Sequence, residues 1–229
     1  TTVIEVMTLA EQAYQQVRWD IISGALPPNQ PLRLEQLKQR YGVGFSPIRE
    51  ALNRLQSDRL VVNVALRGFT VAPISIAEMW DAIETRCLIE GDALRRSIEK
   101  GDDAWEAHVV AAYHALMLKA KSVSTLPRPV SEADLRALEE RHHAFHRALI
   151  AGCQSQWLLD FADKLYVETE RYRFPNLRDS SPLPDRDIGN EHQVLMTTVL
   201  ARDADTATQL LQTHYRNTGR ILADLIGRF

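Results

Sequence analysis

The sequence predicts a mainly α-helical protein in two parts, a small N-terminal domain that contains a β-hairpin and a larger all-α helical bundle. Three observations support this prediction. Strand-forming residues are concentrated in one stretch, residues 60–72. After residue 73, apolar residues recur at the three- and four-residue spacing of amphipathic helices. Segments rich in proline and serine separate these periodic stretches, so we expect domains at residues 1–72 and 73–229.

The first predicted domain begins with two helices. Thr8 suits the N-cap of a helix that stops at Gly24, because a threonine hydroxyl can accept a backbone N–H of the first turn. The following segment, "ALPPNQPL", cannot be helical, since adjacent prolines fix φ and lack an N–H donor. A second helix is expected over residues 33–42, which end in glycine.

A third helix and a hairpin complete this domain. We expect Ser46 to cap the third helix, with Pro47 at its first position and its end near residue 59. Residues 60–72, "LVVNVALRGFTVA", contain many β-branched residues around a glycine, which predicts two strands joined by a turn. Three short helices followed by a hairpin are typical of a winged helix-turn-helix, which binds DNA.

Charge is distributed unevenly between the two parts. The whole chain has a formal net charge of −3. Residues 1–72 carry eight Lys or Arg and six Asp or Glu, whereas residues 73–229 carry nineteen and twenty-four. A mildly basic segment on an acidic body can bind double-stranded DNA through a local patch.

The DNA contacts are expected at the start of the third helix, at the tip of the hairpin and before the second helix. They are Phe45, Ser46, Pro47, Arg49, Arg67, Gly68 and Arg33. The second helix of a helix-turn-helix presents its exposed face to the major groove, and its N-terminus favours phosphate oxygens. The alternative for Arg49 is an ordinary surface charge that pairs within its own helix.

The second domain is predicted to be a bundle of about six helices. They are expected over residues 75–100, 103–122, 132–151, 154–173, 187–201 and 203–226. The two cysteines show no CxxC spacing, which fits a reducing cytoplasm. We expect neither a signal peptide nor a membrane span, and hence a cytoplasmic location.

Four of the seven histidines are predicted to face the interior of this bundle. Residues four apart share a helix face, so His142 and His146 fall on an apolar stripe while His143 points to solvent. His192 and His214 lie on the apolar stripes of the last two helices, which a short connection should pack antiparallel.

Four inward imidazoles from three helices are typical of a transition-metal site. Neutral imidazole suits zinc, nickel, iron or copper better than magnesium or calcium. The alternative is a hydrogen-bonded core without metal. That alternative carries the cost of desolvation and of mutual repulsion on protonation, but the pattern alone leaves both interpretations open.

The first domain resembles the winged helix-turn-helix of GntR-type bacterial transcription regulators, through "YGVGFSPIREALNRLQSDRLV" and "RGFTV". The residues that match the family pattern in order are Pro47, Arg49, Glu50, Ala51, Leu52, Leu55, Leu60, Val61, Arg67, Gly68, Phe69 and Val71. Gly44 and Phe45 replace the usual serine and arginine. Phenylalanine cannot donate to guanine, so we expect a different operator or a contact of Phe45 with a thymine methyl.

The second domain resembles the FCD effector domain of the FadR-type branch, through "ETRCLIE", "HHAFHRALIAGCQSQWLL" and "NEHQVLMTTVLARDADTATQLLQTHY". In that family an aspartate and three histidines bind a divalent metal. The resemblance assigns these roles to His142, His146, His192 and His214. His142 stands where the family has aspartate, which favours zinc, nickel or copper over manganese, unless His142 does not ligate.

The resemblance also implies a small organic acid as effector. Arg86, four residues before Glu90, is expected to project into the bundle and clamp a carboxylate; the alternative is an ion pair on the helix surface. Arg171 and Tyr172 are candidates for a second clamp.

The sequence predicts a homodimeric DNA-binding regulator, and the family resemblance implies by default a repressor that an organic acid releases from its operator. One alternative is a metalloenzyme with an accessory DNA-binding domain. No HExxH, nucleophile elbow or phosphate-binding loop supports it, and the inward stripes offer no free carboxylate beside the histidines. The other alternative is a DNA-binding protein whose bundle only dimerises.

Overall fold

The computed structural model describes residues 7–66, 68–127, 129–179 and 186–227. Contacts between Cα atoms divide the chain into two compact units. The first unit comprises Thr1–Ser75 and Glu170–Pro175, and the second comprises Ile76–Thr169 and Asn176–Phe229. The division thus falls three residues after the expected boundary at residue 72, and it assigns a short stretch from late in the chain to the N-terminal unit.

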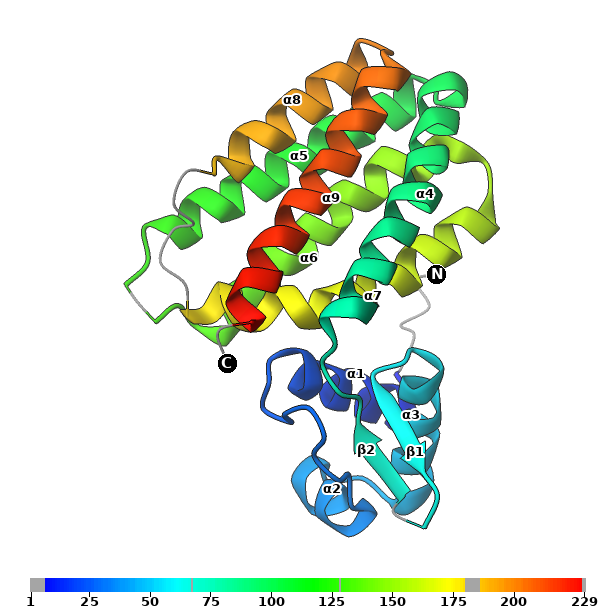
Figure 1. Cartoon of the computed structure of the whole chain (residues 1–229), viewed down its shortest axis with the longest axis vertical. Coiled ribbons are helices and arrows are strands. Elements are labelled where there is room, and N and C mark those ends of the chain that lie inside the picture. The colour runs from blue at the N-terminus through cyan, green and yellow to red at the C-terminus, as the bar shows by residue number, and fades with distance from the viewer. Residues whose placement is uncertain (1–6, 67, 128, 180–185, 228–229) are drawn as a thin grey trace, which may run out of the picture. The chain divides into compact units, whose positions relative to one another are not determined.

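The first unit has the predicted order of three helices and a hairpin (Figure 1). Its elements are α1 (Leu9–Ile22), α2 (Leu34–Tyr41), α3 (Phe45–Ser57), β1 (Val61–Val64) and β2 (Gly68–Val71). Thr8 caps α1 as expected, since its Oγ1 accepts the N–H of Glu11 at 3.1 Å. Val17, Leu52 and Leu55 are fully buried and form the core against which α1 and α3 pack.

The start of α3 differs from the prediction. Its N-cap is Gly44, with φ −71° and ψ 172°, and not Ser46, which lies inside the first turn with Pro47. A proline is tolerated there because the N–H that it lacks would have no helical partner in the first turn. As a result, Phe45 is the first residue of the helix and is 45% exposed, whereas a cap at Ser46 would place it before the helix.

The two strands pair antiparallel, as predicted for the hairpin. Val61 faces Val71 and Val64 faces Gly68 across the ladder. Gly68 has a φ of +75°, a conformation that glycine adopts without strain. Arg67, another predicted DNA contact, lies outside the described residues.

The second unit consists of helices that cross one another as a bundle (Figure 1). They are α4 (Ile76–Lys100), α5 (Asp103–Ser124), α6 (Glu132–Ile150), the short 3₁₀ helix η1 (Ala151–Cys153), α7 (Gln156–Asp179), α8 (Ile188–Leu200) and α9 (Ala204–Ile226). In this unit α4 packs chiefly on α9, and α5 on α6. Side chains of Asp102, Ser131, Asp187 and Asp203 cap the helices that follow them.

The helix α7 ends later than its sequence predicts. α7 continues to Asp179, whereas we expected a loop from residue 174 because Pro175 follows. In the first unit Phe174 is 1% exposed, and its ring meets the Trp19 ring edge-on at 4.7 Å between centroids. Burial of this aromatic pair supports the helix where proline weakens it.

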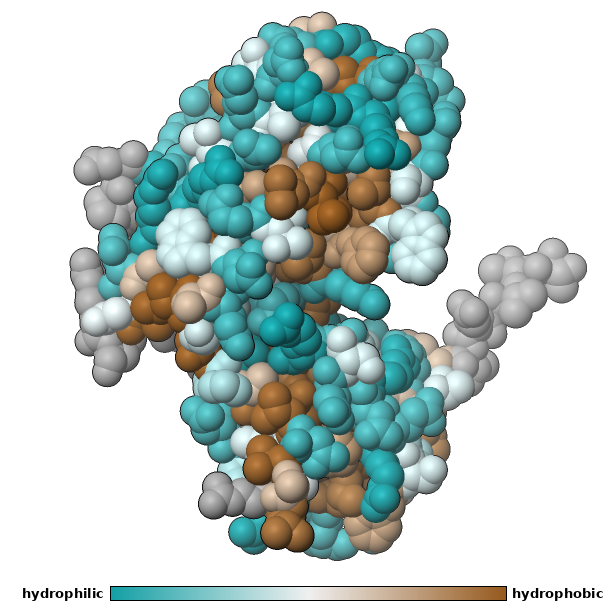
Figure 2. All heavy atoms as spheres, turned by 45° about the vertical axis from the view of Figure 1, so that its right-hand side comes forward, coloured by the Kyte–Doolittle hydropathy of each residue, from teal (hydrophilic) through white to brown (hydrophobic). Residues whose placement is uncertain are grey.

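Hydrophilic residues cover much of the face drawn in Figure 2, and hydrophobic residues form smaller patches on it. Large apolar side chains that stay exposed on the second unit include Leu88, Leu118, Trp157 and Phe161. None of the helices described is both long and apolar enough to cross a membrane. Cys87 and Cys153 are buried free thiols.

Candidate metal centre and nucleic-acid interface

Four histidines from three helices of the second unit converge on one point. His142 and His146 lie on α6, His192 on α8 and His214 on α9. One potential ligand nitrogen from each lies within 4.8 Å of all the others. His142 is half-buried and the other three are buried. The rings of His192 and His214 are 4.7 Å apart between centroids, so the last two helices do bring these residues face to face.

His143 lies outside this cluster. Its Nε2 is 3.4 Å from Oδ1 of Asp163, and its side chain is 39% exposed. The ring stacks on Tyr166 with 3.9 Å between centroids. The three histidines of residues 142–146 thus separate into two that point inward and one on the surface, as helical phase predicts.

A buried carboxylate lies beside His142, contrary to the expectation that the histidines have none. Glu139 is 4% exposed and accepts a hydrogen bond from the hydroxyl of Tyr166. That hydroxyl oxygen is 3.2 Å from Nδ1 of His142. The spacing of 139, 142 and 146 is i, i+3 and i+7, which places all three on one helix face and could have revealed Glu139.

A second chain of contacts reaches His146. Its Nδ1 lies 3.1 Å from the hydroxyl oxygen of Tyr215, and this hydroxyl donates to Oε2 of Glu90. Burial, followed by the negative charge of Glu90, raises the pKa of Tyr215 well above its ordinary value. The phenol therefore keeps its proton and acts as the donor to Glu90.

His214 contacts a carboxylate directly. Its Nδ1 lies 2.7 Å from Oε2 of Glu191, whose two oxygens accept from Arg186 at 2.8 and 2.7 Å. Burial by itself raises the pKa of Glu191, but the hydrogen bonds from Arg186 and His214 outweigh it and bring the pKa to about 2. Glu191 is therefore ionised at neutral pH. The apolar stripes gave no signal for either Glu191 or Arg186.

The donor set fits a divalent transition metal. Burial lowers the pKa of His146 well below 6.5, and it also lowers the pKa of His214, so both imidazoles are neutral and offer a lone pair. The Nε2 atoms of His142 and His146 are 3.1 Å apart. Two nitrogens bound tetrahedrally to zinc at about 2.0–2.1 Å would be about 3.4 Å apart. The cluster therefore suits a divalent transition metal in both chemistry and size.

Arg86 is buried next to this cluster and is not on the helix surface. Its Nε donates to Glu90 at 2.6 Å and its Nη1 to Oγ1 of Thr169 at 2.9 Å. The guanidinium carbon lies 4.1 Å from the centroid of the Tyr215 ring. The pairing with Glu90 expected for a surface helix thus exists, but inside the bundle, where an ion pair is desolvated.

Arg171 and Tyr172, the candidates for a second clamp, group with a different unit from the four histidines. Both belong to the stretch Glu170–Pro175 that groups with the first unit. Arg171 donates from Nη2 to the carbonyl of Ala72 at 2.5 Å, and Tyr172 is 2% exposed. α7 contributes to both units, and helical periodicity alone could not assign a residue on it to one of them.

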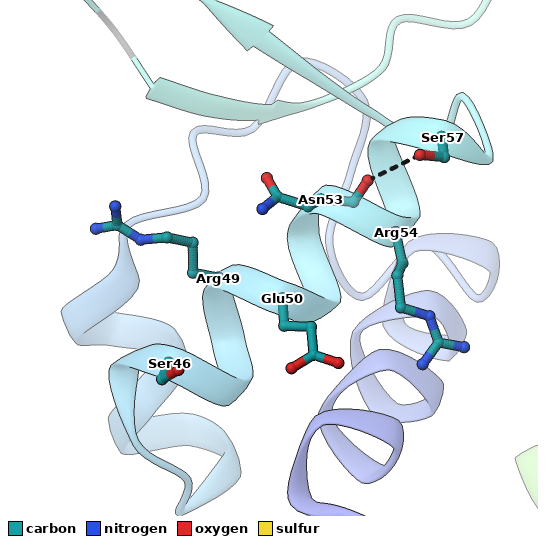
Figure 3. Close-up of a pocket in the computed structure, with 6 residues that line it drawn as sticks. All are labelled: Ser46, Arg49, Glu50, Asn53, Arg54 and Ser57. Atoms are coloured by element: carbon teal, nitrogen blue, oxygen red, sulfur yellow. Dashed lines mark hydrogen bonds between the residues drawn. The ribbon is translucent and has the colours of Figure 1, made fainter.

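The exposed face of α3 carries the candidate DNA contacts. The side chains around a hollow on this face come from Ser46, Arg49, Glu50, Asn53, Arg54 and Ser57 (Figure 3). Arg54 is bound to Glu11 of α1 at 2.6 Å, whereas Arg49 points away from Arg54 and forms no ion pair within the described part of the chain. The alternative of Arg49 as a charge neutralised within its helix therefore finds no support in the contacts.

A groove beside the hairpin is lined by further residues that were predicted to contact DNA. Arg33, Arg49 and Gly68 line it together with Asn63, Thr70 and neighbouring residues. Phe45 lies at the start of α3, and the Nζ of Lys38 is 4.7 Å from its ring centroid. The start of α3, the residue before α2 and the wing thus contribute to one exposed surface of the first unit.

Comparison with known proteins agrees with this arrangement. Residues 9–71 match the model for "Bacterial regulatory proteins, gntR family", and residues 81–217 match the FCD domain. The regulator BphR of Paraburkholderia xenovorans is 39% identical over 216 residues, which cover 94% of this chain and 86% of that protein. The transcriptional repressor GlaR of Escherichia coli is 37% identical, covering 88% of this chain and 90% of GlaR.

A solved structure shows the same fold at low identity. The structure of McbR/YncC from Escherichia coli superposes with a TM-score of 0.77 at 18% identity, and the match covers 96% of this chain and all of that one. Members of the family that both models describe are regulators of transcription and not enzymes. The chain therefore belongs to the GntR family of bacterial transcriptional regulators, with an FCD domain as its C-terminal part.

Proposed function

We propose that this regulator is a homodimeric, metal-dependent repressor whose affinity for operator DNA falls when a small organic acid binds. His142, His146, His192 and His214 hold a divalent ion, zinc or nickel, and the acid binds next to it. The observation that carries this proposal is the convergence of four imidazoles, three of them buried, on one point. A cluster of neutral imidazoles is costly to bury unless it ligates or is fully hydrogen-bonded.

Arg86 is the proposed anchor for the acid. Its guanidinium lies against Tyr215, which in turn contacts His146, so a carboxylate near the ion is close to Arg86. Glu90 already occupies Nε of Arg86. An incoming carboxylate must share the guanidinium with Glu90 or displace it, and either change alters contacts between α4 and α9. Such a difference in contacts between two states is what allostery requires.

The DNA-binding proposal assigns bases and phosphates to specific side chains. Arg49 and Phe45 face the major groove from α3, Ser46 and Pro47 bring the helix N-terminus to a phosphate, and Arg33 contacts a phosphate. Gly68 and Arg67 of the wing follow the backbone. α4 begins at Ile76, only a few residues after β2 ends at Val71, so a shift of α4 is transmitted directly to the wing.

Dimerisation and repression have their own support. Proteins with a helix-turn-helix generally read two half-sites about 34 Å apart, which requires two copies. Exposed apolar residues on the second unit, including Leu88 and Trp157, offer surface that a partner could cover. GlaR, at 37% identity, is named a repressor. Because the chromosome is the target, the cytoplasm is the proposed location.

The test begins with the metal. Tag-free protein is analysed by elemental mass spectrometry, and thermal-shift screening of organic acids then identifies ligands that stabilise the metal-loaded form. Operator fragments are selected from genomic DNA by binding. Fluorescence anisotropy should show operator affinity falling about tenfold or more with a stabilising acid, the range of typical allosteric coupling.

Two variants and one control substitution make the test specific. His146→Ala should lose the metal and the response to the acid, whereas His114→Ala, which removes an exposed histidine on α5, should keep both. Arg86→Ala should keep the metal and lose the response. A metal-free wild-type protein, or a full response in His146→Ala, would contradict metal dependence and leave a bundle that only dimerises.

A further inference from the structure

Two of the four histidines are connected to buried carboxylates in the same way. Nδ1 of His142 contacts the hydroxyl of Tyr166, which donates to Glu139. Nδ1 of His146 contacts the hydroxyl of Tyr215, which donates to Glu90. The two tyrosines come from different helices, α7 and α9, and the two glutamates from α6 and α4. The same His–Tyr–Glu order is thus built twice from unrelated parts of the sequence.

The direction of these hydrogen bonds fixes the tautomer of each imidazole. A tyrosine that donates its only proton to a carboxylate can offer the histidine only its oxygen lone pairs. Nδ1 of His142 and of His146 must therefore be the protonated nitrogen. Nε2 is then unprotonated on both rings, with its lone pair available to a metal.

The two unprotonated nitrogens point at each other. Nε2 of His142 and Nε2 of His146 are 3.1 Å apart, a distance at which two lone pairs repel. A cation that both nitrogens bind converts this repulsion into two favourable bonds. The arrangement also affects the charge around the ion. Because His142 is a histidine, none of the four ligands is a carboxylate. Glu139, 3.7 Å from Nδ1 of His142, places a negative charge directly behind that ring.

We propose that Tyr166 with Glu139, and Tyr215 with Glu90, are positioning pairs that hold His142 and His146 with Nε2 toward the bound ion. His142 is therefore a ligand of that ion, and Glu139 supplies from the second layer the negative charge that the four histidines lack. This inference rests on the proposed metal site. It adds four residues that act through the ligands and do not touch the metal themselves.

The first test measures metal affinity in full-length, tag-free, metal-stripped protein by competition for Zn(II) with a chromophoric chelator. Tyr166→Phe and Glu139→Gln should each weaken binding about 10- to 100-fold, the usual effect of removing such a partner. Tyr113→Phe is the matched control, because it deletes a tyrosine hydroxyl on α5 whose ring packs on Phe145. It should bind as the wild type does.

A second measurement separates positioning from a general loss of structure. Long-range ¹H–¹⁵N spectra of histidine-labelled, zinc-loaded protein should show His142 and His146 protonated at Nδ1. In Tyr166→Phe only the Nδ1–H signal of His142 should change, and the Co(II)-substituted protein should show an altered visible spectrum. Thermal unfolding of the metal-free variants checks that each is folded.

The outcomes are distinguishable. If the wild type binds no metal, the proposed metal function and this inference both fail. If the wild type binds zinc and both Tyr166→Phe and Glu139→Gln bind within about twofold of Tyr113→Phe, the positioning role is wrong while the metal site stands. Protonation of His142 at Nε2 in the zinc-loaded wild type would exclude it as an Nε2 ligand and overturn the inference directly.

Discussion

The DNA-facing surface of the first unit depends on few side chains, and Arg49 is central among them. It lines both the hollow on α3 and the groove beside the wing. Arg49→Ala should weaken operator binding by about 1–3 kcal/mol if the side chain reads a base, and should reduce the salt slope by about one if it contacts a phosphate.

Anisotropy titrations at several salt concentrations measure both quantities for Arg49→Ala. Arg96→Ala is the control, since it removes an exposed arginine of the second unit that pairs with Asp92 at 2.9 Å. Unchanged affinity and an unchanged salt slope in Arg49→Ala would contradict the assignment of α3 as the recognition helix.

Cys87 gives a prediction about pH at the residue scale. Burial raises the pKa of this thiol to about 11. At pH 8 about one thiol in a thousand is then ionised, against about one in four for an exposed thiol of pKa near 8.5. Iodoacetamide should therefore leave Cys87 almost unmodified at pH 8, and its rate should rise with pH up to about 11. Peptide mass spectrometry follows Cys87 separately from Cys153; complete labelling at pH 8 in folded protein would refute the prediction.

Helical phase predicts where single histidines point but not what holds them. The four-residue spacing was enough to place His146 inside and His143 outside. Tyr166, the partner of His142, and Glu191, the partner of His214, each lie on a different helix from their histidine. Glu191 is also charged, and an apolar stripe does not include a charged position. Their recruitment depends on three-dimensional contacts that balance the cost of burying a charge, and no local pattern records that balance.

At the scale of elements, α9 lies close to α4 at Gly219. A Cβ added at Gly219 would lie 2.7 Å from Cδ1 of Ile83 and 2.9 Å from the ring of Trp80. Gly219→Ala should therefore lower the free energy of unfolding by about 1–3 kcal/mol from overpacking, reduced by the roughly 1 kcal/mol that alanine gains in a helix. Chemical denaturation of metal-free protein measures the difference.

The control for this substitution is Gly189→Ala in the first turn of α8. There the added Cβ meets only Oδ1 of Asp187, at 3.4 Å, which is an ordinary contact. Its stability should equal or slightly exceed that of the wild type. A Gly219→Ala protein as stable as Gly189→Ala would show that α4 and α9 can separate without cost.

Element boundaries were predictable where a local residue decides them and not where distant packing does. Thr8 caps α1 as its chemistry predicts. The helix α3 starts at Phe45 because Gly44 supplies the extended residue before it. The N-cap predicted at Ser46, from the serine-proline pair, is therefore wrong by two positions. α7 continues to Asp179 although Pro175 follows the buried Phe174, and only long-range packing explains this.

At the scale of the whole molecule, the chain separates its two tasks into two compact units. All four proposed ligands belong to the second unit, and the candidate DNA contacts belong to the first. Metal binding should therefore stabilise the second unit first. At a free concentration one hundred times the dissociation constant, a ligand that binds only the folded state contributes about 2.7 kcal/mol.

Hydrogen exchange measured by mass spectrometry can locate that stabilisation. Addition of zinc to metal-free protein should slow exchange in α6, α8 and α9, which carry the histidines, and should change α1–α3 much less. His146→Ala should show no zinc effect in any of these helices, because the ion loses a buried ligand. Equal slowing in both units of the wild type would mean that metal binding orders the chain as a single cooperative body, and the effector would then act on DNA binding through global stability instead of through α4.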